Sequence, residues 1–113
     1  MGNIQDPASF LGAQRASLAL FIMAQLDGVP LDEMRAPTRG RPLVARTRQI
    51  AIHIARVVFA MSYRELAQEF GRDTSTIRHA CARIEAMRED SLTFDAAMSW
   101  REILVRRAAG LEQ

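Results

Sequence analysis

The stretch M-S-Y-R-E-L-A-Q-E-F-G-R-D-T-S-T-I-R-H-A-C-A-R-I-E, from Met61 to Glu85, decides the fold, because it reads as two short helices joined at a tight turn. Ser62, followed three residues later by Glu65, forms a capping box in which each side chain satisfies a free backbone N–H of the other residue. The first helix is therefore expected to begin at Ser62. Gly71 readily takes a positive φ and is expected to end it. This pattern is the outline of a helix-turn-helix.

The second helix of the pair is expected to be capped by Asp73 or Thr74 and to carry two different faces. One face is an apolar stripe made of Ile77, Ala80, Cys81, Ile84 and Met87. At about 100° per residue, the opposite face holds Ser75, His79, Ala82 and Ala86, with Arg78 and Arg83 on its flanks. Small hydroxyls at the N-terminal end of a helix, with arginines behind them, suit a helix that enters the major groove of DNA by its tip.

The rest of the chain predicts more helices, so the expected fold class is all-α, a small helical bundle containing the helix-turn-helix. Asp6-Pro7 is a favourable helix start, and the first helix should run from there to about Asp27. The longest helix is expected from about Leu43 to Ala60. After a polar break at residues 88–92, a last helix is expected from Thr93 to Ala109.

Apolar spacing assigns an inward face to each helix. The expected core positions are Leu31 and Met34 in a short turn, Val44, Ile50, Ile54, Val57 and Val58 in the long helix, and Phe94, Ala97, Met98, Trp100, Ile103 and Leu104 in the last one, with Trp100 as its anchor. The first helix carries more apolar residues than one core stripe needs: Phe10, Leu11, Leu18, Phe21, Ile22 and Leu26. It either completes the core or also contacts a partner. His53 is expected to be a surface or part-buried residue, and Cys81 is expected in the core.

The positive charge of the chain is concentrated in its middle. Residues 35–88 hold eleven arginines against four acidic residues, a balance of +7, whereas residues 1–34 carry −3 and residues 89–113 carry −2. A basic centre between acidic ends is the electrostatic pattern of a nucleic-acid binder, because neutralising phosphates supplies much of the affinity. The other interpretation is a solvated surface that happens to be rich in arginine.

The segment Ala36-Pro37-Thr38-Arg39-Gly40-Arg41-Pro42 is expected to form a basic loop, since two prolines and a glycine keep it from being helical. An extended arginine arm beside a helix-turn-helix is well placed to enter a minor groove. The alternative is a mobile linker. On the following helix, four polar side chains are expected to stand off the apolar stripe: Arg46, Arg48, Gln49 and Arg56.

Two motifs together resemble a known family. V-A-R-T-R-Q-I-A at Val44 to Ala51, followed by F-G-R-D-x-S-T-I-x-H-A-C-x-R-I-E at Phe70 to Glu85, is similar to the C-terminal DNA-binding domain (domain IV) of the bacterial chromosomal replication initiator DnaA. The resemblance covers the chain from about Ile22 onward. It implies one such domain over residues 1–113, with a helical extension at about 1–27, and double-stranded DNA as the partner.

The resemblance also implies roles for individual residues. Asp73, Thr74 and Ser75 would read bases, and Arg39 and Arg41, in the R-x-R of the loop, would enter the minor groove. Phosphate contacts are implied for Arg48, Gln49, Arg56 and Thr76, and Arg78 adds one where the family often has an apolar residue. There are two departures from the family pattern: Thr74 replaces the usual His, and the single Gly71 replaces Gly-Gly. Both put the standard initiator box in doubt as the target.

Several function classes are not expected. The chain has no G-x-x-x-x-G-K-[ST] phosphate loop, no hydrolase-type side-chain set and no paired Cys/His spacing, so we expect no enzyme, no cofactor, no metal and no small-molecule substrate. At 113 residues, one domain without an ATPase is expected. The apolar run at residues 16–24 is too short to span a bilayer and follows a poor signal-peptide start. The sequence therefore predicts a cytoplasmic, nucleoid-associated protein without membrane contact.

The leading hypothesis is a sequence-specific DNA-binding protein that occupies initiator-box-like sites and regulates replication initiation or transcription. The alternative is a protein-interaction adaptor with little DNA binding of its own, whose partners would be full-length DnaA or its ATPase regulators. A phage or mobile-element regulator with the same fold is a third hypothesis that the residues do not separate from the first.

Overall fold

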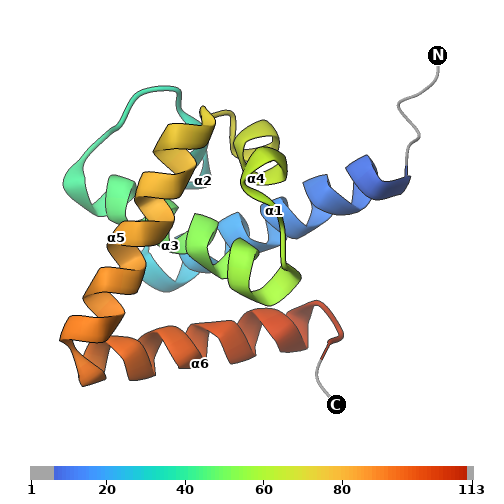
Figure 1. Cartoon of the computed structure of the whole chain (residues 1–113). Helices are drawn as coiled ribbons and strands as arrows, with labels where there is room; N and C mark the ends of the chain where they lie inside the picture. The colour runs from blue at the N-terminus through green and yellow to red at the C-terminus, as the bar shows by residue number, and fades with distance from the viewer. Residues whose placement is uncertain (1–6, 112–113) are drawn as a thin grey trace.

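The computed structural model describes residues 7–111, with side chains from residue 11 onward, and over this range the chain is all-α, as the sequence predicts. Its helices are α1 (Pro7–Asp27), α2 (Leu31–Arg35), α3 (Pro42–Phe59), α4 (Tyr63–Phe70), α5 (Thr74–Asp90) and α6 (Leu92–Ala108) (Figure 1). The predicted cap Asp6 and the side chain of Phe10 lie outside the described residues. No helix within residues 7–111 combines the length and apolar character needed to cross a bilayer.

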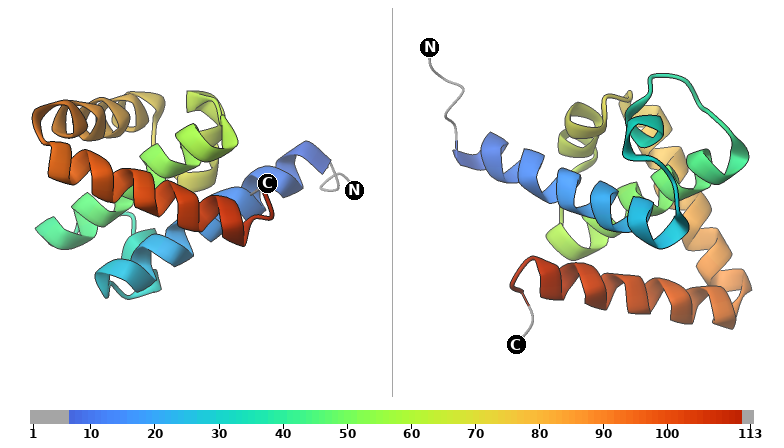
Figure 2. Two further views of the ribbon diagram at one scale, coloured as in Figure 1. Left: turned by 90° about the horizontal axis from the view of Figure 1, so that it is seen from below. Right: turned by 180° about the vertical axis from the view of Figure 1, so that it is seen from behind.

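Helix α3 is the centre of the bundle and contacts each of the five other helices. Figures 1 and 2 show α1 and α5 crossing it on different sides, with α6 along one edge of the molecule. The buried side chains form a single cluster, to which α1 contributes Ala16, Ala19, Leu20, Met23 and Ala24. Helix α1 is therefore an integral part of the core, although the apolar surplus on it is exposed at Leu11, Phe21 and Leu26.

The helix boundaries follow from local capping. The predicted capping box is confirmed: the Glu65 backbone N–H donates to Ser62 Oγ at 3.0 Å, and the Ser62 N–H donates to Glu65 Oε1 at 2.8 Å. Gly71 takes φ of 65° and ends α4. Ser91 alone separates α5 from α6, and its side chain accepts from the Phe94 N–H at 3.1 Å. The predicted polar break is thus one residue long, because Ser91 caps the start of α6.

The predicted inward face of α6 is wrong at three positions. Trp100 is 54% exposed, and Ile103 and Ala97 are exposed as well. The inward stripe instead runs through Asp95, Met98, Glu102 and Val105, of which Met98 and Val105 are fully buried. Asp95 and Glu102 are turned inward because both carboxylates bind Arg88, and at about 100° per residue this places Trp100 on the far side of the helix. Val57 of α3, also predicted inward, is exposed too.

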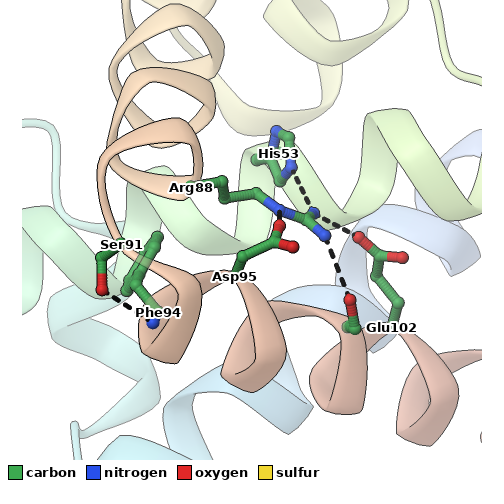
Figure 3. A network of polar contacts seen from close by, with 7 residues as sticks. His53, Arg88, Ser91, Phe94, Asp95 and Glu102 are labelled. Carbon is green, nitrogen blue, oxygen red and sulfur yellow. Dashed lines mark hydrogen bonds and ion pairs between the residues drawn. The ribbon is translucent and has the colours of Figure 1, made fainter.

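Part-buried polar contacts link α3, α5 and α6 around Arg88 (Figure 3). The guanidinium of Arg88 binds Asp95 and Glu102 by ion pairs, Ser99 by a hydrogen bond, and Nε2 of His53 at 3.1 Å. His53 was expected near the surface but is only 2% exposed, because it faces Arg88 in this cluster. Burial first, and then the charge of Arg88, lower the pKa of His53 below 6.5, so the ring is neutral at pH 7.

We expect acidification to destabilise the protein through His53. Its pKa is lower in the folded chain than in the unfolded chain, so the unfolded chain binds more protons and stability falls as the pH drops below about 6.5. The midpoint of urea unfolding should be lower at pH 5.5 than at pH 7.5, and His53→Gln should reduce that difference. An equal decline in wild type and variant would contradict this.

Candidate nucleic-acid interface

The N-terminal tip of α5 is open to solvent. Asp73, Thr74, Ser75 and Thr76 are all exposed, and no described part of the chain covers them. Oδ1 of Asp73 caps the helix by accepting from the Thr76 N–H at 2.9 Å and from the Ser75 hydroxyl at 2.8 Å. These bonds lower the pKa of Asp73 and keep it ionised. Because Asp73 is exposed, its carboxylate can also accept a hydrogen bond from a partner.

The two predicted faces of α5 are confirmed. Ile77, Ala80, Cys81 and Ile84 are buried and Met87 is half-buried, whereas Ser75, Arg78, His79, Ala82, Arg83 and Ala86 are exposed. Burial raises the pKa of the Cys81 thiol to about 11, in keeping with its predicted place in the core. The exposed face of α5 is therefore free to meet a partner along its length.

The basic arm, residues 36–41, crosses beside the tip of α5 and is held there by Arg48 (Figure 1). Nε of Arg48 donates to the carbonyl of Met34 at 2.9 Å, Nη2 to Glu33 at 3.0 Å, and Nη1 to Arg39 at 3.1 Å. The expectation that Arg48 stands off the core stripe is wrong, because it is only 6% exposed. Burial and the charge of Arg72 lower its pKa. The contact of Arg48 with phosphate stays a prediction. Three of its five N–H groups bind the carbonyls, which leaves two that can donate to a phosphate.

Arg72, in the turn between α4 and α5, is a second anchor of the arm, and sequence reasoning did not assign it a role. Its Nη2 donates to the carbonyl of Ala36 at 2.8 Å and its Nη1 to that of Pro37 at 3.4 Å. These partners lie 36 and 35 residues away, so no local signal could reveal them. Arg48 and Arg72 thus connect the arm to α3 and to the turn before α5, which favours a held arm over a mobile linker.

A cationic pocket of about 330 Å³ lies between the arm, α3 and α5. It is lined by four arginines, Arg39, Arg48, Arg72 and Arg83, and by the polar side chains of Gln49, Thr76 and His79, with no acidic residue among its lining. The structure thus brings together the predicted site residues Arg39, Arg48, Gln49 and Thr76. Arg83 and His79, which the sequence analysis placed on the outward face of this helix without assigning either a specific contact, join them in the lining of the pocket.

The other three predicted site arginines lie outside this pocket. Arg41 is exposed and pairs with Glu33 at 2.8 Å, which directs it toward α2. Arg56 donates to the Met61 carbonyl at 2.8 Å, and its guanidinium lies over the ring of Tyr63. Arg78 lies over the same ring. The positive surface therefore continues from the arm, past the tip of α5, to the α4 side.

The two helices, their tight turn and the exposed polar tip define a helix-turn-helix domain, a class that reads DNA with its second helix. The chain belongs to the bacterial DnaA helix-turn-helix family, whose model matches residues 20–84. This confirms the resemblance on which the site residues were assigned.

Curated relatives agree with this family. The chain is 37% identical over 75 residues to the chromosomal replication initiator protein DnaA of Acinetobacter baumannii (strain AYE), and 33% identical over 75 residues to that of Acinetobacter baylyi. Each match covers 66% of this chain but only 16% of the relative. The corresponding protein of Psychromonas ingrahamii is 35% identical over 71 residues, or 62% of this chain and 15% of the relative. The chain thus spans about a sixth of these relatives.

Proposed function

We propose that the chain is a sequence-specific double-stranded DNA-binding protein that recognises DnaA-box-like sites and regulates replication initiation or transcription. The observation that carries the proposal is the exposed, capped tip of α5 standing beside an anchored basic arm, with an arginine-lined pocket between them. Hydrogen-bonding groups at a helix tip suit base edges, and cations on its flanks suit the phosphates that border a groove.

In this proposal each part of the surface has a different task. Oδ2 of Asp73 accepts from a base amino group in the major groove, while Thr74 and Ser75 contact neighbouring bases. Arg39 reaches the adjacent minor groove, and the other polar residues of the pocket, Thr76 among them, bind phosphates. Each good base contact contributes about 1–3 kcal/mol of discrimination. Thr74 stands where the family usually has His. We therefore expect the relative affinity for different DNA sites to change by about tenfold or more.

The regulatory part of the proposal rests on the relatives. These relatives are chromosomal replication initiator proteins, and the chain matches 16% of their length. A protein that presents this domain at initiator sites would compete with the full-length initiator or assist it there. It acts by binding, without catalysis or a small-molecule substrate.

Fluorescence anisotropy tests the proposal. At moderate salt, the protein should bind an initiator-box duplex at least tenfold more tightly than a scrambled duplex. Arg39→Ala should weaken binding, because its exposed side chain has no partner within residues 7–111 and its carbonyl bond to Arg48 is kept. Arg106→Ala on α6, far from the tip of α5, is the matched loss of one charge and should have little effect. Equal affinity for both duplexes would remove the sequence-specific claim.

The exposed apolar residues of α1 favour a second candidate, an adaptor that binds the initiator or its regulators. Phe21 is 50% exposed, and Leu11 and Leu26 are also exposed. Deleting α1 would unfold the core, so Phe21→Ser with Leu26→Ser is the better test. Loss of initiator capture in this variant, with normal DNA binding, would support the adaptor function. Unchanged capture would exclude this surface.

A further inference from the structure

Two arginines share one aromatic ring on the side of the helix-turn-helix that faces away from the arm. The guanidinium carbon of Arg56 lies 3.9 Å from the centroid of the Tyr63 ring, and that of Arg78 lies 4.5 Å from it. The three residues come from α3, α4 and α5. Both distances are well inside the roughly 6 Å at which a cation is attracted to an aromatic face.

The charges of these two arginines are not neutralised within the described chain. Neither forms an ion pair with an acidic residue in the range 7–111. Arg56 donates one hydrogen bond, to the Met61 carbonyl, and Arg78 donates none to any described residue. Most of their ten N–H donors are therefore free, although the ring restricts where the two guanidinium groups lie.

The position of Arg78 on α5 shows which side of the helix it faces. Thr76 and Arg83 line the pocket beside the arm. At about 100° per residue, Arg78 lies roughly 140–160° around the helix from both of them, toward α4. A helix in a major groove has a sugar-phosphate strand on each side. Cations on both flanks of α5 would therefore meet different strands.

We propose that Tyr63 is a positioning residue that holds Arg78 and Arg56 ready for backbone phosphates of the strand on the α4 side, opposite the strand met by the arm. This rests on the proposed DNA-binding function. An arginine that is already oriented loses less side-chain freedom on binding, so the ring raises affinity without touching DNA itself. Because phosphates carry no sequence information, its contribution is the same on every duplex.

The experiment compares Tyr63→Leu with Tyr63→Phe, which keeps the ring. In anisotropy at about 100 mM salt, Tyr63→Leu should bind initiator-box and scrambled duplexes about 3- to 10-fold more weakly, with their affinity ratio unchanged. Tyr63→Phe should stay within about twofold of wild type. In an Arg56→Ala, Arg78→Ala background the Leu and Phe variants should bind equally, since the ring then has nothing to position.

A second measurement needs no variant. In the free wild-type protein, ¹⁵N relaxation should show the Nε–H of Arg78 to be more restricted than that of Arg64, an exposed arginine on α4 without a ring contact. Equal mobility of the two would overturn the proposal. The proposal would also be overturned if Tyr63→Leu bound DNA as tightly as wild type, or if it lost only its preference for the initiator box. A wild type that binds no duplex overturns the proposed function as well, so the two failures are distinguishable.

Discussion

Replacing Arg88 with leucine is expected to lower the free energy of unfolding by about 3 kcal/mol, the lower end of the range for removing one partner of a buried ion pair, because its pairs with Glu102 and Asp95 are part-buried. Burial works against the charge of Arg88, but its bonds to Glu102 and Asp95 outweigh this and raise its pKa. Glu102 has a side chain only 16% exposed and would be left without its cation. The contact of Arg88 with His53 would be lost as well.

Urea unfolding followed by circular dichroism measures this effect. Arg106→Leu on α6 removes the same charge outside the cluster and should cost less than about 1 kcal/mol. Adding Glu102→Gln to Arg88→Leu should restore part of the stability, because the unpaired carboxylate is the main source of the loss. A loss for Arg88→Leu as small as that of the control would show that the cluster does not hold α6 in place.

Replacing Arg48 with methionine is expected to release the arm and to cost about 2–3 kcal/mol of stability, since three carbonyl groups lose their donor. DNA affinity should fall by at least tenfold, because Arg39 would no longer be held beside the tip of α5. The loss should exceed that of Arg39→Ala alone, as the backbone of the whole arm is affected.

Arg48→Lys separates the two roles of this residue. A lysine keeps the positive charge but cannot reproduce the fork that reaches three carbonyls. If Arg48 acts chiefly by anchoring the arm, Arg48→Lys should resemble Arg48→Met in urea unfolding and anisotropy. If it acts chiefly as a phosphate contact, Arg48→Lys should stay close to wild type. Arg46→Met, on α3 two residues before Arg48 and beside the arm, serves as the control for loss of one positive charge.

The helix-turn-helix could be predicted because its signals are local. The capping box at Ser62, the positive φ of Gly71 and the cap at Asp73 each depend on residues within one turn of each other. The apolar stripe of α5 from Ile77 to Ile84 has the same origin. These features fixed the exposed face of α5, and with it the proposed base readers.

The residues whose burial was predicted wrongly are those whose environment depends on distant parts of the chain. Arg48 reaches carbonyls 9 to 15 residues away, and His53 meets Arg88 across 35 residues. Trp100 was expected inward on apolar character alone, but the ion pairs of Arg88 decide which face of α6 is buried. Periodicity places apolar side chains well, but it does not show where a buried charge finds its partner.

NMR can show whether the tip of α5 and the arm form the DNA-reading surface. A duplex containing an initiator box is titrated into ¹⁵N-labelled protein, and the backbone amide shifts are followed. We expect the largest changes at residues 73–79 and 38–41, with little change along α6. Shifts concentrated on α6 or on the exposed face of α1, with the tip of α5 unchanged, would contradict it.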